Sequence, residues 1–264
     1  MQTVQRAKRI GSTTLIVVVG LLLAYALNNL VFHWQWPFGD SSKATIAPAG
    51  AATVTRIEPE VLDCRARINA TVPLKGKKDY TNHNPVHDFV YRTDTLKLAA
   101  VGDVDTCVRD GATVQELKNG GWAVNVPAES VEFVRPRVDA VATAKSVDFE
   151  KGWVGKFTDA FPWVDDNNGL TPAAYAYAQT IIGGSSCMKA AWTPTQRAIV
   201  AAYKQQAADK HIDPNKVEVT FSGTPNFSQH DADMKDLGFN GFEFKVDAGK
   251  VECRVDPGAL QTQS

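Results

Sequence analysis

The residues whose types and spacing could do chemistry lie in one polar stretch, Lys77–Asp88 (KKDYTNHNPVHD). His83 and His87 are four residues apart, and Asp88 follows directly. On a helix, two histidines at this spacing share a face and could bind one metal ion. An asparagine and a proline between them oppose a helix, however, so the spacing loses that meaning. We therefore expect a polar surface loop here and assign no metal ligand, with His83, His87 and Asp88 as the only candidates.

A hydrolytic site is the second chemical interpretation of the same loop. His87 followed by Asp88 suggests a general base and the carboxylate that orients it. The sequence contains no G-x-S-x-G nucleophile motif, so we assign no catalytic residue. A second His/Asp group, Gln229–Asp233 (QHDAD), lacks the regular acidic spacing and the closing Glu of a calcium loop. We therefore predict that Gln229–Asp233 forms a solvated turn.

The four cysteines are Cys64, Cys107, Cys187 and Cys253. None belongs to a C-x-x-C pair, so a structural zinc site would need unusual spacing. An even number in an exported domain favours two disulfides over four free thiols, and three connectivities are open. We favour Cys64–Cys107, which would join two early strands, and Cys187–Cys253, which would tie the end of the first helix to the last strand.

Export is indicated by a stretch without Asp, Glu, Lys or Arg, from residue 10 to residue 39, in which His33 is the one titratable side chain that could carry a positive charge. Residues 11–32 are long and apolar enough to cross a hydrocarbon core of roughly 30 Å as a helix. Three basic residues precede this segment: Arg6, Lys8 and Arg9. Basic flanks stay in the cytoplasm, so the rest of the chain is expected outside it. Trp34 and Trp36 follow the segment and suit the lipid headgroup interface.

The expected organisation is a cytoplasmic basic tail at 1–10, a transmembrane helix or signal anchor at 11–32, a linker at 33–53 and an extracytoplasmic α+β domain at 54–264. The alternative is a signal peptide cleaved after Ala26, since Ala24-Tyr25-Ala26 resembles a small-x-small site. Trp34 and Trp36 favour the uncleaved anchor. They would lie at the membrane–water interface in that case, and they would have no evident role at the N-terminus of a cleaved protein.

Composition and charge limit the classes of partner. Hydrophobic residues make up 44% of the chain, which is typical of a globular protein rather than a disordered one. The chain has 28 Lys and Arg and 29 Asp and Glu. Three of the basic residues lie in the N-terminal tail, so the rest of the chain carries a small net negative charge. Nucleic-acid binding needs clustered Lys and Arg, and we expect no nucleic-acid partner.

Hydrophobic periodicity predicts an α+β domain with a mainly antiparallel sheet and a helical pair. The expected strands lie near 60–72, 95–101, 107–114, 122–126, 131–141, 217–221, 241–246 and 250–255. Asn119-Gly120-Gly121 predicts a tight hairpin turn. Thr171-Pro172 and Thr193-Pro194 each predict the start of a helix, the first running to about Ile182 and the second to about Lys210.

A family resemblance accompanies this layout. Leu96–Val104 (LKLAAVGDV), Ala123–Pro127 (AVNVP) and Val138-Asp139 resemble a bacterial membrane-anchored family called domain of unknown function 4230. The resemblance covers about residues 55 to 205. It departs from the family pattern where Val126-Pro127 replaces Leu-Pro and where an Asp-Leu pair after the first strand is absent. It implies the anchored topology and an α+β domain, and it carries no activity or catalytic residue.

The expected function is that of a membrane-anchored extracytoplasmic module, a binding or accessory component of the cell envelope rather than an enzyme. Its expected partners are membrane lipid, through the N-terminal helix, and an envelope protein or lipid. We expect no cofactor. The alternative is an envelope hydrolase that uses the His83, His87 and Asp88 loop, with or without a metal ion.

Overall fold

The computed structural model describes residues 40–60, 64–83, 88–109, 111–152, 169–231 and 238–259. The predicted tail, the 11–32 segment, residues 33–39 and His87 lie outside these ranges, as do Arg6, Lys8, Arg9, Trp34 and Trp36. No helix among the described residues is long and apolar enough to cross a membrane. The chain divides into two compact units, and the described part of the smaller one holds residues 40–42, 80–83 and 88–91. The remainder forms the larger unit.

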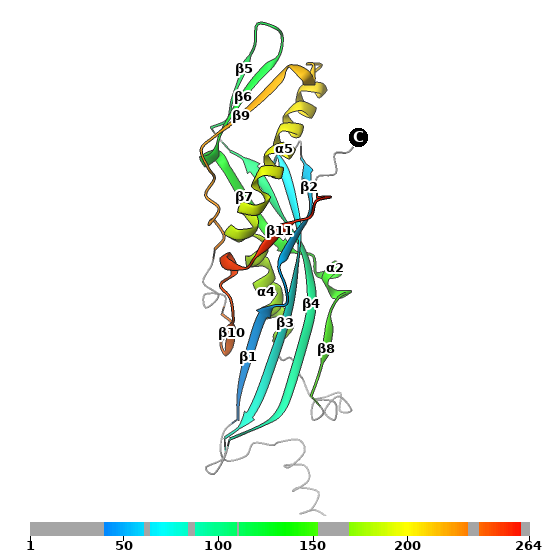
Figure 1. Ribbon diagram of the computed structural model, residues 1–264, viewed down its shortest axis with the longest axis vertical. Helices are drawn as coiled ribbons and strands as arrows, with labels where there is room; N and C mark the ends of the chain where they lie inside the picture. The colour runs from blue at the N-terminus through cyan, green and yellow to red at the C-terminus, as the bar shows by residue number, and fades with distance from the viewer. Residues whose placement is uncertain are drawn as a thin grey trace, which may run out of the picture. The chain divides into compact units, whose positions relative to one another are not determined.

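One large, mostly antiparallel sheet contains eight strands (Figure 1). Five of them lie in the order β10 (Phe242–Phe244), β1 (Asp40–Pro48), β3 (Ala66–Asn82), β2 (Ala52–Pro59) and β11 (Cys253–Val255). β4 (Phe89–Val108) pairs with β3, with β7 (Val131–Val138) and with β8 (Asp148–Glu150). The short strands β10 and β11 run parallel to β1 and β2. Together with the helices described below, this sheet confirms the predicted α+β class and its mainly antiparallel sheet.

A second sheet joins β5 (Thr113–Glu116), β6 (Trp122–Pro127) and β9 (Val217–Ser222). The predicted Asn119-Gly120-Gly121 turn connects β5 to β6. Gly120 has a φ of 76°, and the Gly121 N–H donates to Asn119 Oδ1 at 3.0 Å. A Cβ on Gly121 would lie 2.2 Å from the Lys216 carbonyl oxygen, so only glycine fits there.

The predicted helical pair is α4 (Leu170–Ile182) and α5 (Ser185–Asp209), and both its starts differ from the prediction. α4 is capped by Gly169, and Pro172 lies in its first turn, where a missing N–H costs nothing. α5 begins at Ser185, so Pro194 lies inside it. Cys187, Met188 and Ala191 are fully buried before that proline, so core packing holds the helix through it.

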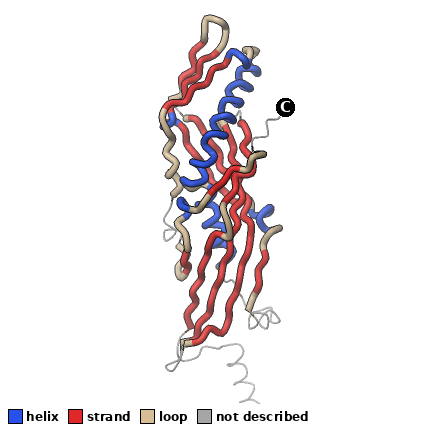
Figure 2. Tube along the Cα trace, viewed as in Figure 1, coloured by secondary structure: helices blue, strands red, loops and turns tan. Residues whose placement is uncertain are grey.

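Short elements complete the fold: α2 (Ala140–Ala144), η1 (Ala128–Ser130), η2 (Pro214–Lys216) and η4 (Ala248–Lys250). Figure 2 shows the helices against the strands, with α5 packed on β2 and β9. Alternate residues of β3 are buried in the core: Ala66, Ile68, Ala70, Val72 and Leu74. The largest buried side chains from the helices include Tyr177, Ile181, Met188 and Ile199.

Two predicted loops are strands instead. The expected linker is wrong for residues 40–53, which contain β1 and the start of β2. Ala44 and Ile46 on β1 alternate into the core, a pattern too short to stand out among small residues. The polar stretch Lys77–Asp88 is strand as far as Asn82, and residues 78–81 are half-buried while Asn82 is buried.

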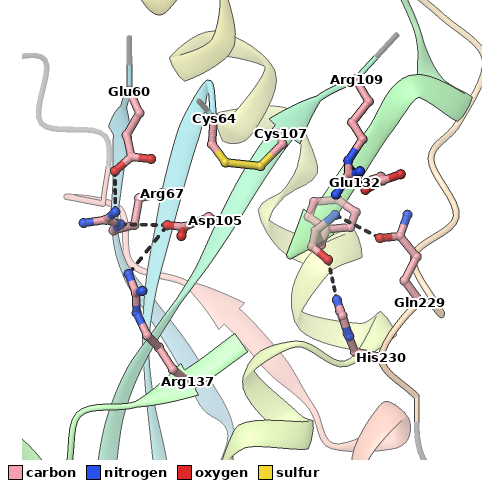
Figure 3. The surroundings of a disulfide bond; sticks show 11 residues. Glu60, Cys64, Arg67, Asp105, Cys107, Arg109, Glu132, Arg137, Gln229 and His230 are labelled. Carbon is pink, nitrogen blue, oxygen red and sulfur yellow. Dashed lines mark hydrogen bonds and ion pairs between the residues drawn. A yellow bond between two sulfur atoms is a disulfide. The ribbon is translucent and has the colours of Figure 1, made fainter. Parts of the chain in front are cut away.

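The cysteines form two disulfides, Cys64–Cys107 and Cys187–Cys253, which is the pairing favoured from the sequence. Figure 3 shows the first, which joins the chain just before β3 to β4. The second joins the first turn of α5 to β11.

Candidate functional site

Three polar side chains meet in the smaller unit, and we call them the hairpin end: Ser41, His83 and Asp88. Ser41 lies on β1, and the other two flank the connection between β3 and β4. His83 Nε2 lies 2.6 Å from Ser41 Oγ, and His83 Nδ1 lies 3.1 Å from Asp88 Oδ1.

The order of these atoms is that of a serine–histidine–carboxylate relay. A carboxylate on Nδ1 favours the tautomer in which Nδ1–H donates to Asp88 and Nε2 accepts from the Ser41 hydroxyl. A hydroxyl held in this way can pass its proton to the imidazole when it attacks a carbonyl carbon. The His83 side chain is 46% exposed and the Asp88 side chain 60%. Water therefore screens the attraction between His83 and Asp88. In an efficient relay the carboxylate is buried, and its interaction with the imidazole is not screened in this way.

The structure brings His83 and Asp88 together, while His87 lies outside the described residues. Among the described residues, no group of three or more His, Cys, Asp or Glu side chains gathers to hold a metal ion. Sequence reasoning missed Ser41, because it placed residues 33–53 in a linker. Only the pairing of β1 with β3 brings Ser41 near the hairpin, and no local signal predicts that pairing.

A pocket of about 320 Å³ lies in the larger unit, between α4, β7 and the segment after β9. Its lining combines small or apolar residues with polar ones: Pro136, Ala176, Gln179, Thr180, Gln229, His230 and Asp231. The last three are consecutive in the chain, and we call them the pocket wall.

The first two residues of the pocket wall bind the edge of β7 (Figure 3). The Phe133 N–H donates to Gln229 Oε1 at 2.9 Å, and Gln229 Nε2 donates to the Val131 carbonyl at 3.2 Å. His230 Nε2 contacts the Phe133 carbonyl, which only accepts, so this nitrogen carries the proton. β7 pairs with β4 on one side, and these side chains replace a neighbouring strand on the other.

The third residue of the pocket wall caps a helix from a distance. Asp231 Oδ1 accepts from the Ser185 N–H at 2.9 Å, at the first residue of α5. A carboxylate there satisfies one of the unpaired N–H groups of the helix start and suits its dipole. The predicted turn is present at residues 227–230, but Gln229 and His230 are half-buried rather than solvated, because their side chains bind the backbone of β7.

A charged network joins β3, β4 and β7 near the Cys64–Cys107 disulfide (Figure 3). Arg67 contacts Glu60 Oε1 at 2.6 Å and Asp105 Oδ1 at 2.9 Å. Arg137 reaches the same Asp105 oxygen at 3.7 Å. Burial raises the pKa of the Glu60 carboxyl, and Arg67 offsets part of this rise. The Asp105 side chain is 5% exposed, so the two guanidinium groups stabilise a charge that burial alone would disfavour. We assign this network a structural role.

Comparisons with known proteins give no match to a family model, to a curated protein sequence or to a solved structure. The resemblance to the membrane-anchored family of unknown function therefore stays a prediction.

Proposed function

We propose that this chain is a membrane-anchored module of the cell envelope that binds a polar envelope component on its extracytoplasmic side. The observation that carries the proposal is the pair of disulfides, since protein disulfides persist chiefly in oxidising compartments. The uncharged stretch from residue 10 to residue 39, with basic residues only before it, supports the same topology.

The pocket is the proposed binding site. It offers an amide, a hydroxyl, an imidazole and a carboxylate from separate segments of the larger unit. The wall residues are held by hydrogen bonds to β7 and α5, so they lose little freedom when a ligand binds. The pocket is small and partly polar, which suits a sugar or a short peptide portion of an envelope polymer rather than a lipid chain.

Site-specific photocrosslinking in intact cells tests this binding. A photoreactive amino acid replaces Gln179, which is exposed at the pocket, and in a second variant it replaces Val141, which is 76% exposed on α2. We expect an adduct with an envelope component at position 179 and none at position 141. Equal or absent crosslinking at the two positions, in a chain that is exported and oxidised, would contradict a binding role for the pocket.

A second candidate function, an envelope esterase, is favoured by the hairpin end. Ser41 Oγ would attack the ester carbonyl carbon while its proton passes to His83 Nε2 and then to the leaving alcohol. Water would then hydrolyse the acyl-serine, its proton passing through the same imidazole. The exposure of His83 and Asp88 places this candidate second, because catalytic hydrogen bonds gain strength only where water is excluded.

A fluorophosphonate probe distinguishes this second candidate. We expect labelling of the full chain at Ser41 only if the relay is reactive, with loss in Ser41→Ala and a strong decrease in His83→Ala. Ser42→Ala is the matched control, since Ser42 is an exposed neighbouring hydroxyl. Absent labelling, or labelling that Ser41→Ala leaves unchanged, rules out the esterase.

A further inference from the structure

We propose that the β3–β4 hairpin inserts Phe89 and Val90 into the headgroup region of the membrane that holds the predicted anchor. The proposal rests on the proposed function, because it needs that anchor. It adds a second point of membrane contact, made by the folded domain rather than by the N-terminal segment.

The two residues are exposed and apolar at the start of β4. Phe89 is 42% exposed and Val90 is 53% exposed. Consecutive strand residues point to opposite faces, so an apolar side chain leaves the strand on each face. A strand with one face on a core would alternate apolar and polar residues instead. Apolar groups exposed on both faces of a strand end suit insertion into a lipid interface.

Two tyrosines of the same unit support this interpretation. The rings of Tyr80 and Tyr91 lie with their centroids 6.3 Å apart, so they form a pair on the two strands of the hairpin. Tyrosine has an apolar ring and a polar hydroxyl, and it is enriched where hydrocarbon meets water. The pair would lie at the water-facing side of the inserted residues.

The length of chain between the predicted anchor and the hairpin limits their separation. Trp36 is expected at the interface, and Ser41 lies five residues later in the sequence. An extended chain spans at most about 3.6 Å per residue, so Ser41 lies within roughly 18 Å of Trp36. Ser41 Oγ is 2.6 Å from His83 Nε2, which fixes this end of the hairpin to β1. The hairpin therefore stays within reach of the headgroups.

Charge in the smaller unit indicates which kind of lipid surface would bind. Its described residues contain no Lys or Arg, and they include two acidic residues, Asp40 and Asp88. Anionic lipids attract basic segments, so they offer no gain here. Insertion would depend on apolar burial, with little sensitivity to salt or to the fraction of anionic lipid.

Lipid photolabelling of the full chain tests the proposal. The protein is reconstituted in phosphatidylcholine vesicles that contain a phosphatidylcholine with a photoreactive group on its acyl chain, and adducts are mapped by mass spectrometry. We expect adducts in the N-terminal segment and at Phe89 or Val90. Val141 is the internal control, because it is more exposed than either residue and lies on α2.

A double variant, Phe89→Ser with Val90→Ser, provides the second measurement. It should lower hairpin labelling roughly tenfold while labelling of the N-terminal segment stays unchanged, since each half-exposed side chain contributes a few-fold to partitioning. N-terminal adducts with hairpin labelling no higher than at Val141 would overturn the insertion and leave the anchor standing. Absence of N-terminal adducts, with the protein washed off by alkaline carbonate, would overturn the proposed anchor and the insertion together.

Discussion

The pocket wall and the hairpin end are each built from three polar side chains with a histidine among them, yet they use these side chains differently. In the pocket wall, Gln229 and His230 bind the backbone of β7, and Asp231 binds the start of α5. In the hairpin end, Ser41 and Asp88 each contact the His83 ring, and the side chains of His83 and Asp88 are exposed to solvent. The pocket wall therefore stabilises the fold through its backbone contacts. The hairpin end leaves its imidazole accessible to solvent and to a ligand.

The difference shows why a His/Asp pattern in a sequence predicts little by itself. A histidine whose ring nitrogen donates to a buried strand is committed, because moving it would leave a carbonyl without a partner. When a histidine contacts only exposed side chains, rearranging it costs little free energy, because water can replace the lost contacts. Changes in stability therefore distinguish the two regions more sharply than the identities of their residues do.

The largest expected effect is at the Cys187–Cys253 disulfide, which fixes the same helix start that Asp231 caps. Replacing both cysteines with alanine should lower the free energy of unfolding by about 4 kcal/mol, because the bridge closes a long loop in the unfolded chain. Urea unfolding of the variant, compared with the oxidised parent, measures this. A loss below about 1 kcal/mol would show that the bridge does not hold this region.

Gln229→Ala is expected to have the next largest effect, a loss of about 2–3 kcal/mol. It removes two hydrogen bonds and leaves the Phe133 N–H and the Val131 carbonyl without these partners at a part-buried edge. Denaturant unfolding measures the loss, with Ser228→Ala at the exposed preceding residue as the control. Equal stability of the two variants would contradict the role given to the pocket wall.

Tyr177 on α4 gives a pH-dependent effect in the larger unit. Burial raises the pKa of its hydroxyl to about 12, and the hydroxyl donates to the Val246 carbonyl. Because the folded-state pKa lies above the unfolded value near 10, this contribution to stability is complete below pH 10 and is lost as the pH rises towards 12. Tyr177→Phe should cost about 1 kcal/mol at neutral pH. The difference from the parent should shrink across that alkaline range, and a constant difference would be contrary to this account.

The smallest effect is expected at the hairpin end, where His83→Ala should change stability by less than about 0.5 kcal/mol. His230→Ala should cost about 1–2 kcal/mol, because the Phe133 carbonyl loses its partner. Thermal unfolding of the two variants side by side gives the comparison directly. If His83→Ala proved the more costly, the hairpin end would be the structural region of the two.

Much of the fold could be predicted because its signals are local. Asn119-Gly120-Gly121 identifies its own turn, and the periodicity of α4 and α5 identifies the helices. The favoured disulfide pairing is confirmed, although Cys187, which was expected at the end of the first helix, lies in the first turn of α5. The start of α5 was missed, since Thr193-Pro194 imitates a helix start while the core packing of Cys187 and Met188 decides where the helix begins.

The candidate sites were predictable only in part, because they depend on contacts between distant segments. His83 and Asp88 are close in sequence, and their polar neighbours drew attention to them. Ser41 reaches them only through the pairing of β1 with β3. Gln229 meets Phe133 across nearly a hundred residues, and nothing in the sequence around either position indicates that contact.

The central claim is that an N-terminal anchor holds a disulfide-bonded domain outside the cytoplasm. The most direct measurement is made on intact cells that express the full chain with a C-terminal tag, treated with an external protease and then denatured without reduction for thiol counting. The account predicts a chain in the membrane fraction, a tag removed by the protease and no reactive thiol. A protected chain in the cytosol with four reactive thiols would contradict it.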